Sequence, residues 1–380
     1  MNPGETGASP LPNRLVLVLA PLAGALLTLS LAPFNFWPSA IIGCAIYAYL
    51  LALAPPGQAA WRGWLFGLGL FGSGASWVYV SIRVYGNASL PLAALLTIAF
   101  CAGLALLHSL QAWLYARFVR PLPGGMLLGF PALWVLGEWL RSWLLTGFPW
   151  LYLGYAHVDT WLAGWAPITG VYGLSFIVAF SASCLFLAWR SRQTATLVSY
   201  AGLLATLWGG GLMLRPIEWV APASEEPLRV ALYQPNIPLE RKWDPRAYPE
   251  ILRQYEEAVR PLFQQDLILW PESAIPRVRE RAGAFLATVE RRAQLSDTVL
   301  ITGIPTRDEE RRYHNSIIAL GQGTGQYDKQ RLVPFGEYVP LEDWLRGVID
   351  FFDLPMSNFS PGAANQGPLQ AGNHRVAPLI

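Results

Sequence analysis

The chain has 380 residues, of which 53% are hydrophobic and only 14% are charged, and it contains 17 tryptophans. This composition is too apolar and too poor in charge for an ordinary water-soluble domain. The formal net charge of +2 at pH 7 is also too small for a nucleic-acid-binding surface.

The charged residues divide the chain into two parts. Residues 1–214 contain 8 arginines and 3 acidic residues, whereas residues 215–380 contain 19 basic and 22 acidic residues. We therefore expect a short tail at residues 1–13, a membrane domain at residues 14–215 and a water-exposed domain at residues 216–380. All three cysteines, Cys44, Cys101 and Cys184, fall in apolar runs of the first part, which indicates buried thiols and no disulfide framework.

The first part contains seven apolar stretches in succession. A membrane-spanning helix requires about 20 mostly apolar residues. Seven such stretches favour spanning helices over the alternative, which is a set of core helices in a large soluble protein. The stretches are the two halves of residues 15–61, divided at residues 35–38, and residues 63–82, 90–116, 126–145, 162–189 and 194–214.

The arginines between these stretches predict an orientation, because basic residues favour the cytoplasmic side of short connections. With a cytoplasmic N-terminus, only Arg83 and Arg215 lie outside. The six on the cytoplasmic side are Arg14, Arg62, Arg117, Arg120, Arg190 and Arg192. Seven crossings from a cytoplasmic start then place residues 216–380 outside the cytoplasm.

One apolar stretch contains two charges, Glu138 and Arg141. Residues three apart share a helix face, and charges within a membrane span are costly unless they are paired. An internal ion pair is the interpretation that we favour, and a path for substrate or protons is the alternative.

The second part alternates short β-rich runs with charged helical stretches, which is typical of a layered α/β domain with buried strands. We expect strands at residues 228–233, 266–270, 298–304 and 316–320, helices at residues 249–263 and 277–295, and one more buried strand at residues 374–380.

Candidate catalytic residues follow these strands, where ligands bind in open α/β sheets. Glu272 lies in the sequence Trp-Pro-Glu-Ser, and its apolar neighbours favour its use as a general base. The chain has only two lysines, Lys242 and Lys329. A lysine retained where arginine serves almost everywhere indicates that a compact ammonium is needed, or one that can change its protonation state. The alternative is a surface lysine retained by chance. Glu337 follows Lys329 by eight residues.

These residues belong to motifs that resemble the carbon–nitrogen hydrolase (nitrilase) superfamily, namely QPN at 234–236, WPES at 270–273 and KQRLVPFGEYVP at 329–340. The seven apolar stretches, with SWVYVSI at 76–82 and GFPWLYLGY at 147–155, narrow the resemblance to the apolipoprotein N-acyltransferase family of bacterial inner membranes. The resemblance extends from residue 14 onward. It implies a polytopic α-helical membrane domain followed by an extracytoplasmic nitrilase-like αββα sandwich.

The resemblance also implies a Glu-Lys-Cys triad. Glu272 matches the general base, and Lys329 matches the cation that stabilises the tetrahedral oxyanion. A free thiol is mostly protonated at neutral pH, so it needs an adjacent base and cation. The other residues implied at the site are the tryptophan that lines it, the additional glutamate of the family and the apolar shielding loop, which are Trp243, Glu337, Val333 and Phe335.

The implied reaction is N-acylation of apolipoproteins. The cysteine takes an acyl chain from a phospholipid as a thioester and passes it to the α-amine of the N-terminal diacylglyceryl-cysteine. We expect no metal and no cofactor, a monomer, and a multi-pass protein of the inner membrane with its catalytic domain facing the periplasm.

The implied nucleophile stands directly after a strand like RVAPLI, so it would be residue 381, whereas the sequence ends at Ile380. We therefore expect a fragment that stops just before the cysteine and is itself inactive. Two alternatives are a membrane-anchored amidase or nitrilase that hydrolyses a small amide, and a non-catalytic remnant that binds lipid or lipoprotein.

Overall fold

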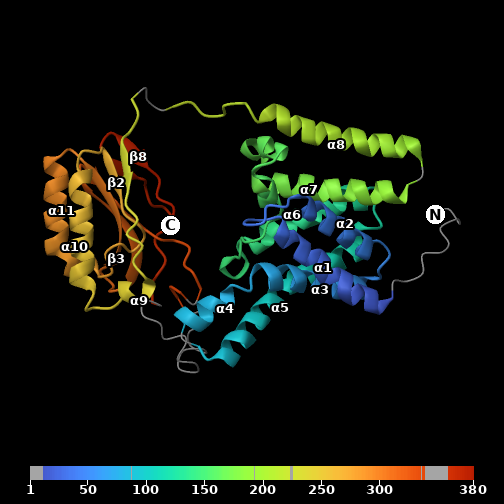
Figure 1. The fold of residues 1–380 in the computed structure, drawn as a ribbon, viewed down its shortest axis with the longest axis horizontal. Coiled ribbons are helices and arrows are strands. Elements are labelled where there is room, and N and C mark those ends of the chain that lie inside the picture. Colours follow the sequence, from blue (N-terminus) through green and yellow to red (C-terminus); the bar gives the residue numbers. More distant parts are fainter. Residues whose placement is uncertain (1–11, 87, 192, 223–225, 335, 339–357) are drawn as a thin grey trace. The chain divides into compact units, whose positions relative to one another are not determined.

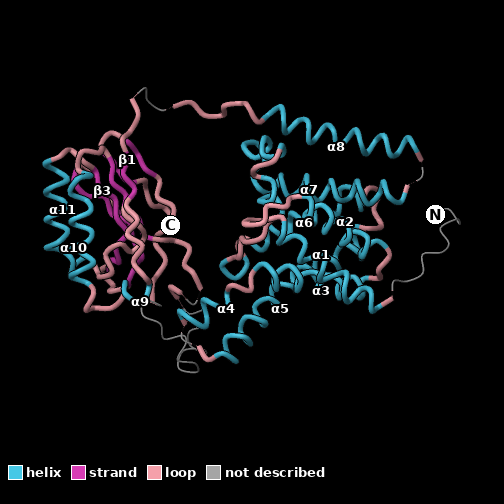
Figure 2. The backbone as a smooth tube through the Cα atoms, viewed as in Figure 1, coloured by secondary structure: helices cyan, strands magenta, loops and turns pink. Residues whose placement is uncertain are grey.

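The computed structural model describes residues 12–380 apart from residues 87, 192, 223–225, 335 and 339–357. The chain divides into a helical unit, Met1–Ala221, and a sheet unit, Pro222–Ile380. Figures 1 and 2 show helices throughout the first unit and all of the strands in the second.

The helical unit contains eight α-helices and several short 3₁₀ or π-helical segments within its described residues. The α-helices are α1 (Asn13–Leu29), α2 (Pro38–Ala52), α3 (Pro56–Gly74), α4 (Val78–Val80), α5 (Leu90–Leu114), α6 (Phe130–Arg141), α7 (Ala166–Arg190) and α8 (Thr194–Leu214). The short segments are η1 (Ser81–Tyr85), η2 (Tyr115–Val119), η3 (Gly125–Gly129), η4 (Leu144–Thr146), η5 (Leu153–His157) and η6 (Trp161–Trp165).

Small residues bring these helices into close contact. A Cβ on Gly67 of α3 would lie 2.7 Å from the Cα of Ala105 on α5, which is nearer than atoms can approach. Close contact of this kind is characteristic of helix packing in membranes, where shape complementarity replaces the hydrophobic effect.

Three helical stretches of the described chain are long and apolar enough to cross a membrane: Leu90–Val119, Trp161–Arg190 and Thr194–Leu214. Pro56–Gly74 and Val78–Tyr85 make a fourth if this pair, bent by 60°, is one span. The other predicted spans correspond to α1, α2 and the run η3–α6. Helices α1 and α2 are apolar but have 17 and 15 residues. The number seven therefore stays a prediction.

The ion pair expected between Glu138 and Arg141 is not formed, although both side chains are buried on α6. Glu138 Oε1 accepts hydrogen bonds from Trp134 Nε1 at 3.0 Å and from the main-chain N–H of Leu153 at 2.8 Å. Arg141 Nη1 donates to the main-chain oxygen of Trp150 at 2.5 Å. The two charges therefore hold the segment between α6 and α7 rather than each other.

The described residues of the sheet unit form two sheets. A five-stranded sheet has the order β1 (Val230–Leu232), β2 (Leu267–Leu269), β3 (Val299–Arg307), β4 (Tyr313–Gly321) and β6 (Gln326–Asp328). Its first three strands are parallel, β4 pairs antiparallel with β3, and β6 pairs antiparallel with β4. A three-stranded antiparallel sheet has the order β5 (Gly323–Thr324), β7 (Leu369–Ala371) and β8 (His374–Val376).

Two helices, α10 (Tyr248–Val259) and α11 (Gly283–Leu295), lie side by side on one face of the five-stranded sheet (Figures 1 and 2). Shorter helical segments are α9 (Leu239–Lys242), η7 (Arg260–Leu262) and η8 (Arg279–Ala282). Alternate residues of the strands face the two sides: Ile318 and Leu320 pack in the core with the helices, whereas Ile317 and Ala319 pack toward β7. The described residues thus form three layers, α, β and β.

The predicted strands and helices lie close to the observed ones, with two corrections. Residues 377–380 are not a strand, and β8 at His374–Val376 is not buried, so the expected buried strand at residues 374–380 is wrong. Its partner β7 supplies the buried residues instead. The short strands β5, β6 and β7 were not predicted, because two- and three-residue strands carry too little alternation to recognise.

Candidate active site

Glu272 lies in a tight turn directly after β2. Trp270 still pairs with β3, where its main-chain N–H donates to the oxygen of Ile301 at 2.9 Å, and the chain then turns beneath Gly303. A Cβ on Gly303 would lie 2.8 Å from both Glu272 Cα and the oxygen of Pro271, so only glycine permits this approach. The turn leaves the Glu272 side chain 51% exposed. The expected apolar setting of its carboxylate is wrong, because the apolar neighbours pack into the core beneath it.

Lys329 is positioned by its pairing with β4. Its main-chain N–H donates to the oxygen of Asn315 at 2.8 Å, which extends the β4–β6 pairing by one residue. Neighbours across a sheet share a face. The ammonium therefore points to the same side as the Asn315 amide, and the side chain is only 9% exposed.

Glu337 closes a turn on Val333. The main-chain N–H of Glu337 donates to the oxygen of Val333 at 2.9 Å, and the N–H of Val333 donates to Glu337 Oε2 at 2.7 Å. This reciprocal pair fixes the carboxylate, whose side chain is 11% exposed. The eight-residue spacing from Lys329 thus brings Glu337 back beside the lysine.

The three charged groups meet in one cluster with Asn315. Lys329 Nζ lies 3.2 Å from Glu272 Oε1 and 3.0 Å from Glu337 Oε1. Asn315 Nδ2 donates to the same two oxygens, at 2.5 Å and 2.8 Å. Each Oε1 atom therefore receives two hydrogen bonds, and one cation faces two carboxylates.

The pKa of Lys329 is raised above its ordinary value. Burial of the ammonium lowers the pKa, but the hydrogen bond with Glu337 and the charges of Glu272 and Glu337 outweigh that effect. Lys329 is therefore charged at neutral pH. A fixed charge of this kind stabilises a developing oxyanion rather than transferring a proton.

The second lysine also reaches this site. Lys242 Nζ donates a hydrogen bond to the main-chain oxygen of Glu272 at 3.0 Å, and the same ammonium lies 5.8 Å from the ring centroid of Trp243. Burial lowers the pKa of Lys242, and the charge of Glu272 opposes that shift. Trp243 is thus brought beside the turn that carries Glu272.

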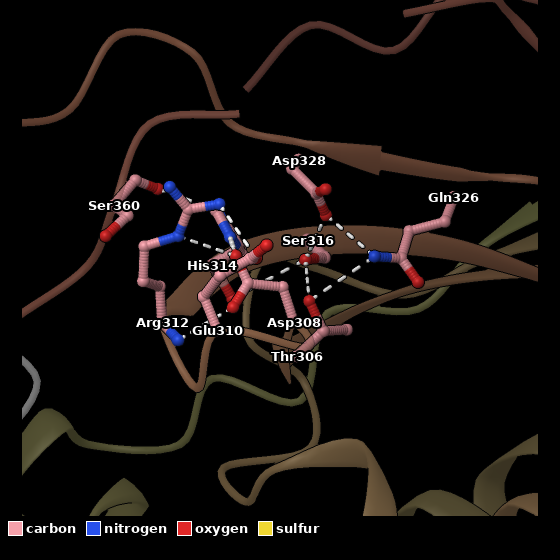
Figure 3. Close-up of polar contacts among 9 residues, drawn as sticks. All are labelled: Thr306, Asp308, Glu310, Arg312, His314, Ser316, Gln326, Asp328 and Ser360. Atoms are coloured by element: carbon pink, nitrogen blue, oxygen red, sulfur yellow. Dashed lines mark hydrogen bonds and ion pairs between the residues drawn. The ribbon is translucent and has the colours of Figure 1, made fainter. Parts of the chain in front are cut away.

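A second polar cluster occupies the opposite face of β4 (Figure 3). The Ser316 hydroxyl lies 2.6 Å from the Thr306 hydroxyl and donates to Asp328 Oδ1 at 2.6 Å. Gln326 Nε2 donates to the same Asp328 oxygen at 2.9 Å. These contacts tie β3, β4 and β6 together on the face opposite the cluster of Glu272, Lys329 and Glu337.

His314 anchors a segment that supports the cluster (Figure 3). Its Nδ1 lies 2.9 Å from the main-chain oxygen of Ser360, and its Nε2 lies 3.0 Å from Asp308 Oδ2. The adjacent N–H groups of Phe359 and Gly362 donate to the main-chain oxygens of Glu337 and Lys329, both at 2.9 Å. His314 therefore stabilises the backbone of the site.

The structure brings three predicted site residues, Glu272, Lys329 and Glu337, into direct contact. Val333 contributes its main-chain N–H, but the residue as a whole is 52% exposed, and Phe335 lies outside the described residues. Sequence reasoning missed Asn315 and assigned no role to Lys242. The available signal for Asn315 was a polar triplet, His-Asn-Ser at 314–316, that opens an otherwise apolar strand.

The three cysteines lie elsewhere. Cys44, Cys101 and Cys184 are buried in α2, α5 and α7, so none belongs to the unit that carries Glu272 and Lys329. Among the described residues no group of three or more His, Cys, Asp or Glu side chains is arranged to hold a metal ion.

A glutamate after a parallel strand, a buried lysine and a second glutamate on an α/β sheet define a carbon–nitrogen hydrolase domain, and the carbon–nitrogen hydrolase family model matches residues 229–372. The model of the apolipoprotein N-acyltransferase N-terminal domain matches residues 23–184. The chain belongs to the apolipoprotein N-acyltransferase family.

Curated proteins of that name align with nearly the whole of this chain. The apolipoprotein N-acyltransferase of Pseudomonas aeruginosa is 47% identical over 370 residues, which are 96% of this chain and 72% of the relative. The protein of that name from Azotobacter vinelandii is 46% identical over 371 residues, with the same coverage. The one from Coxiella burnetii is 41% identical over 366 residues, which are 96% of this chain and 75% of the relative.

Proposed function

We propose that this protein N-acylates apolipoproteins, taking a fatty acyl chain from a phospholipid through a cysteine thioester, with Glu272 as general base and Lys329 as oxyanion cation. The observation that carries the proposal is the Lys329 ammonium held 3.2 Å from Glu272 and 3.0 Å from Glu337. This arrangement supplies a base and a fixed positive charge at one point.

In the first half-reaction, Glu272 accepts the thiol proton of the cysteine that the family resemblance implies, and the thiolate attacks an ester carbonyl of the phospholipid. Cys44, Cys101 and Cys184 are buried in the helical unit and do not supply this thiol. Negative charge develops on the carbonyl oxygen, and the Lys329 ammonium stabilises it. The carbon–oxygen ester bond then breaks, and the lysophospholipid leaves as an alcohol with the proton held by Glu272.

In the second half-reaction, the α-amine of a diacylglyceryl-cysteine attacks the thioester. Glu272 accepts a proton from the amine, the carbon–sulfur bond breaks, and the thiol is regenerated beside the new amide. The 51% exposure of the Glu272 side chain leaves this base accessible to both substrates, whereas Glu337 is enclosed.

We further propose seven membrane crossings, with residues 1–13 as a cytoplasmic tail, residues 14–215 as the membrane domain and residues 216–380 as a periplasmic domain of a monomeric inner-membrane protein. Helices α5 and α7, with their short helical extensions, have 30 residues each and α8 has 21, which suffices to cross a bilayer. Both substrates are amphiphiles, so a multi-pass anchor keeps the site at the bilayer surface. Trp243, Val333 and Phe335 line the site in this proposal.

The experiment measures acyl transfer by the full-length protein from phospholipid to a diacylglyceryl peptide, for wild type, Glu272→Gln and Lys329→Arg. Both variants should lose transfer while remaining inserted in the membrane, and Glu309→Gln on the exposed β3–β4 turn is the matched control that retains it. Near-normal turnover by Lys329→Arg would refute the assignment of the cation.

The same experiment separates the alternatives. Release of free fatty acid or ammonia without amide formation would identify a hydrolase. Binding of the lipopeptide without turnover by the wild type would identify a non-catalytic binding protein.

A further inference from the structure

Asn315 is the least exposed member of the catalytic cluster, with an exposed fraction of 2%. It lies near the start of β4, on the face opposite Ser316, so its side chain points toward Glu272 and Glu337 rather than toward the cluster of Figure 3. Its main-chain oxygen also accepts the hydrogen bond that positions Lys329. Asn315 therefore contacts all three charged residues of the site.

The amide nitrogen of Asn315 reduces the repulsion between the carboxylates of Glu272 and Glu337. Two carboxylate oxygens, one from Glu272 and one from Glu337, lie within 2.5 Å and 2.8 Å of the same Nδ2 atom. Like charges this close repel each other. The two N–H groups of an amide satisfy both oxygens without adding a charge. A second cation there would neutralise the cluster, whereas an amide leaves two carboxylates facing one ammonium.

The orientation of the amide is dictated by its neighbours. If the amide were reversed, its oxygen would face two carboxylate oxygens, which only accept hydrogen bonds. In the observed orientation, Asn315 Oδ1 accepts a hydrogen bond from the Ser273 hydroxyl at 3.4 Å. Ser273 directly follows Glu272, so both ends of the amide are tied to the same turn.

The two glutamates differ in which of their carboxylate oxygens accept hydrogen bonds. Both oxygens of Glu337 accept hydrogen bonds, from Asn315 and Lys329 on Oε1 and from the main-chain N–H of Val333 on Oε2. For Glu272, Oε1 accepts from Asn315 and Lys329, and Oε2 makes no hydrogen bond within the part of the chain that the structure describes. Because Asn315 and Lys329 bind Oε1 of Glu272, its Oε2 atom is left available for proton transfer.

We propose that Asn315 is a positioning residue for the acyl-transfer reaction: its amide holds Glu272 Oε1 against the Lys329 ammonium so that Oε2 faces the reacting groups. This inference rests on the proposed function, because it assigns Glu272 as the base. Misplacing a catalytic group by about 1 Å costs about 100-fold in rate. The loss should appear in kcat, because Asn315 is buried and its amide nitrogen binds the two glutamates.

The test compares kcat and KM of wild type, Asn315→Ala and Asn315→Asp in the full-length protein across pH 5 to 9. Asn315→Ala should lose about 100-fold in kcat at every pH, with little change in KM. Asn315→Asp has the same shape but places a third carboxyl group against two carboxylates. Its kcat should fall as pH rises and recover toward wild type as pH falls, because only the protonated carboxyl donates a hydrogen bond.

The matched control is Ser316→Ala, the next residue of β4, which is also buried and hydrogen-bonded but faces away from the cluster. It should lower the melting temperature without altering the pH profile. Retention of kcat within threefold by Asn315→Ala, or parallel pH profiles for Asn315→Asp and wild type, would overturn the inference. An inactive wild-type protein would instead overturn the proposed function, so the two failures are distinguishable.

Discussion

Lys242 Nζ donates a hydrogen bond to the main-chain oxygen of Glu272, at 3.0 Å, so both lysines of the chain contact the same residue. Lys329 binds the carboxylate and Lys242 binds the peptide backbone. The turn that carries the proposed base is therefore held at two points by two separate cations.

This relationship predicts that Lys242→Met lowers kcat about tenfold, because the Glu272 backbone loses its restraint while the carboxylate keeps its partners. Steady-state kinetics on the full-length protein measures the change. Arg241→Met is the matched control, since Arg241 is the neighbouring cation and its ion pair among the described residues is with the exposed Glu250. Equal losses of kcat in both variants would show that Lys242 acts through its positive charge alone and not through its hydrogen bond with Glu272.

Gly303→Ala should reduce acyl transfer by about 100-fold, because the added Cβ would displace the backbone of Pro271 and Glu272. Some loss of stability is expected too, since the contacted atoms are main chain and cannot rotate aside. Circular dichroism with activity measurements checks both effects. Gly283→Ala, which has open space at the start of α11, should behave as wild type. A fully active Gly303→Ala would contradict the close approach.

Asp266 should contribute stability that depends on pH. Its hydrogen bonds with Arg229, through both the side chain and the main-chain N–H, lower the pKa of Asp266 to about 2. A lowered carboxylate pKa stabilises the folded state above the unfolded pKa of about 4, and this stabilisation is lost as pH falls from about 4 to 2. Melting temperature should therefore fall less steeply over this window in Asp266→Asn than in wild type.

The control for this effect is Glu309→Gln, because Glu309 forms no ion pair among the described residues. Its melting curves should follow wild type at each pH. If Asp266→Asn also follows wild type from pH 4 to pH 2, the Arg229 contact does not stabilise the fold.

The proposed orientation predicts that Glu309→Cys, on the exposed β3–β4 turn, reacts with an impermeant maleimide added to intact spheroplasts. Gly57→Cys, at the start of α3, should react only after lysis, because Arg62 of the same helix lies on the cytoplasmic side in this orientation. The three native cysteines are buried and give little background. Protection of Glu309→Cys in spheroplasts would refute the orientation.

Sequence patterns predicted the order of elements more accurately than their ends. Apolar runs long enough to be helices, and strands such as β3 with continuous burial, produce signals that depend only on neighbouring residues. The predicted helix at residues 277–295 is shorter in the structure, since α11 begins at Gly283 and residues 279–282 form a 3₁₀ turn. The strand expected at residues 374–380 failed because an apolar sequence does not reveal whether a neighbouring strand will cover it.

The sequence alone determined the division between an apolar and a charged half, and the motifs around Glu272, Lys329 and Glu337, because composition and short spacings are local properties. Only the tertiary structure decided how these residues meet. Asn315 enters the site because antiparallel pairing of β4 with β6 places its amide opposite Lys329, and Lys242 enters because α9 lies against the turn after β2. Contacts between residues 14 to 57 positions apart depend on strand register and turn geometry, which no local pattern encodes.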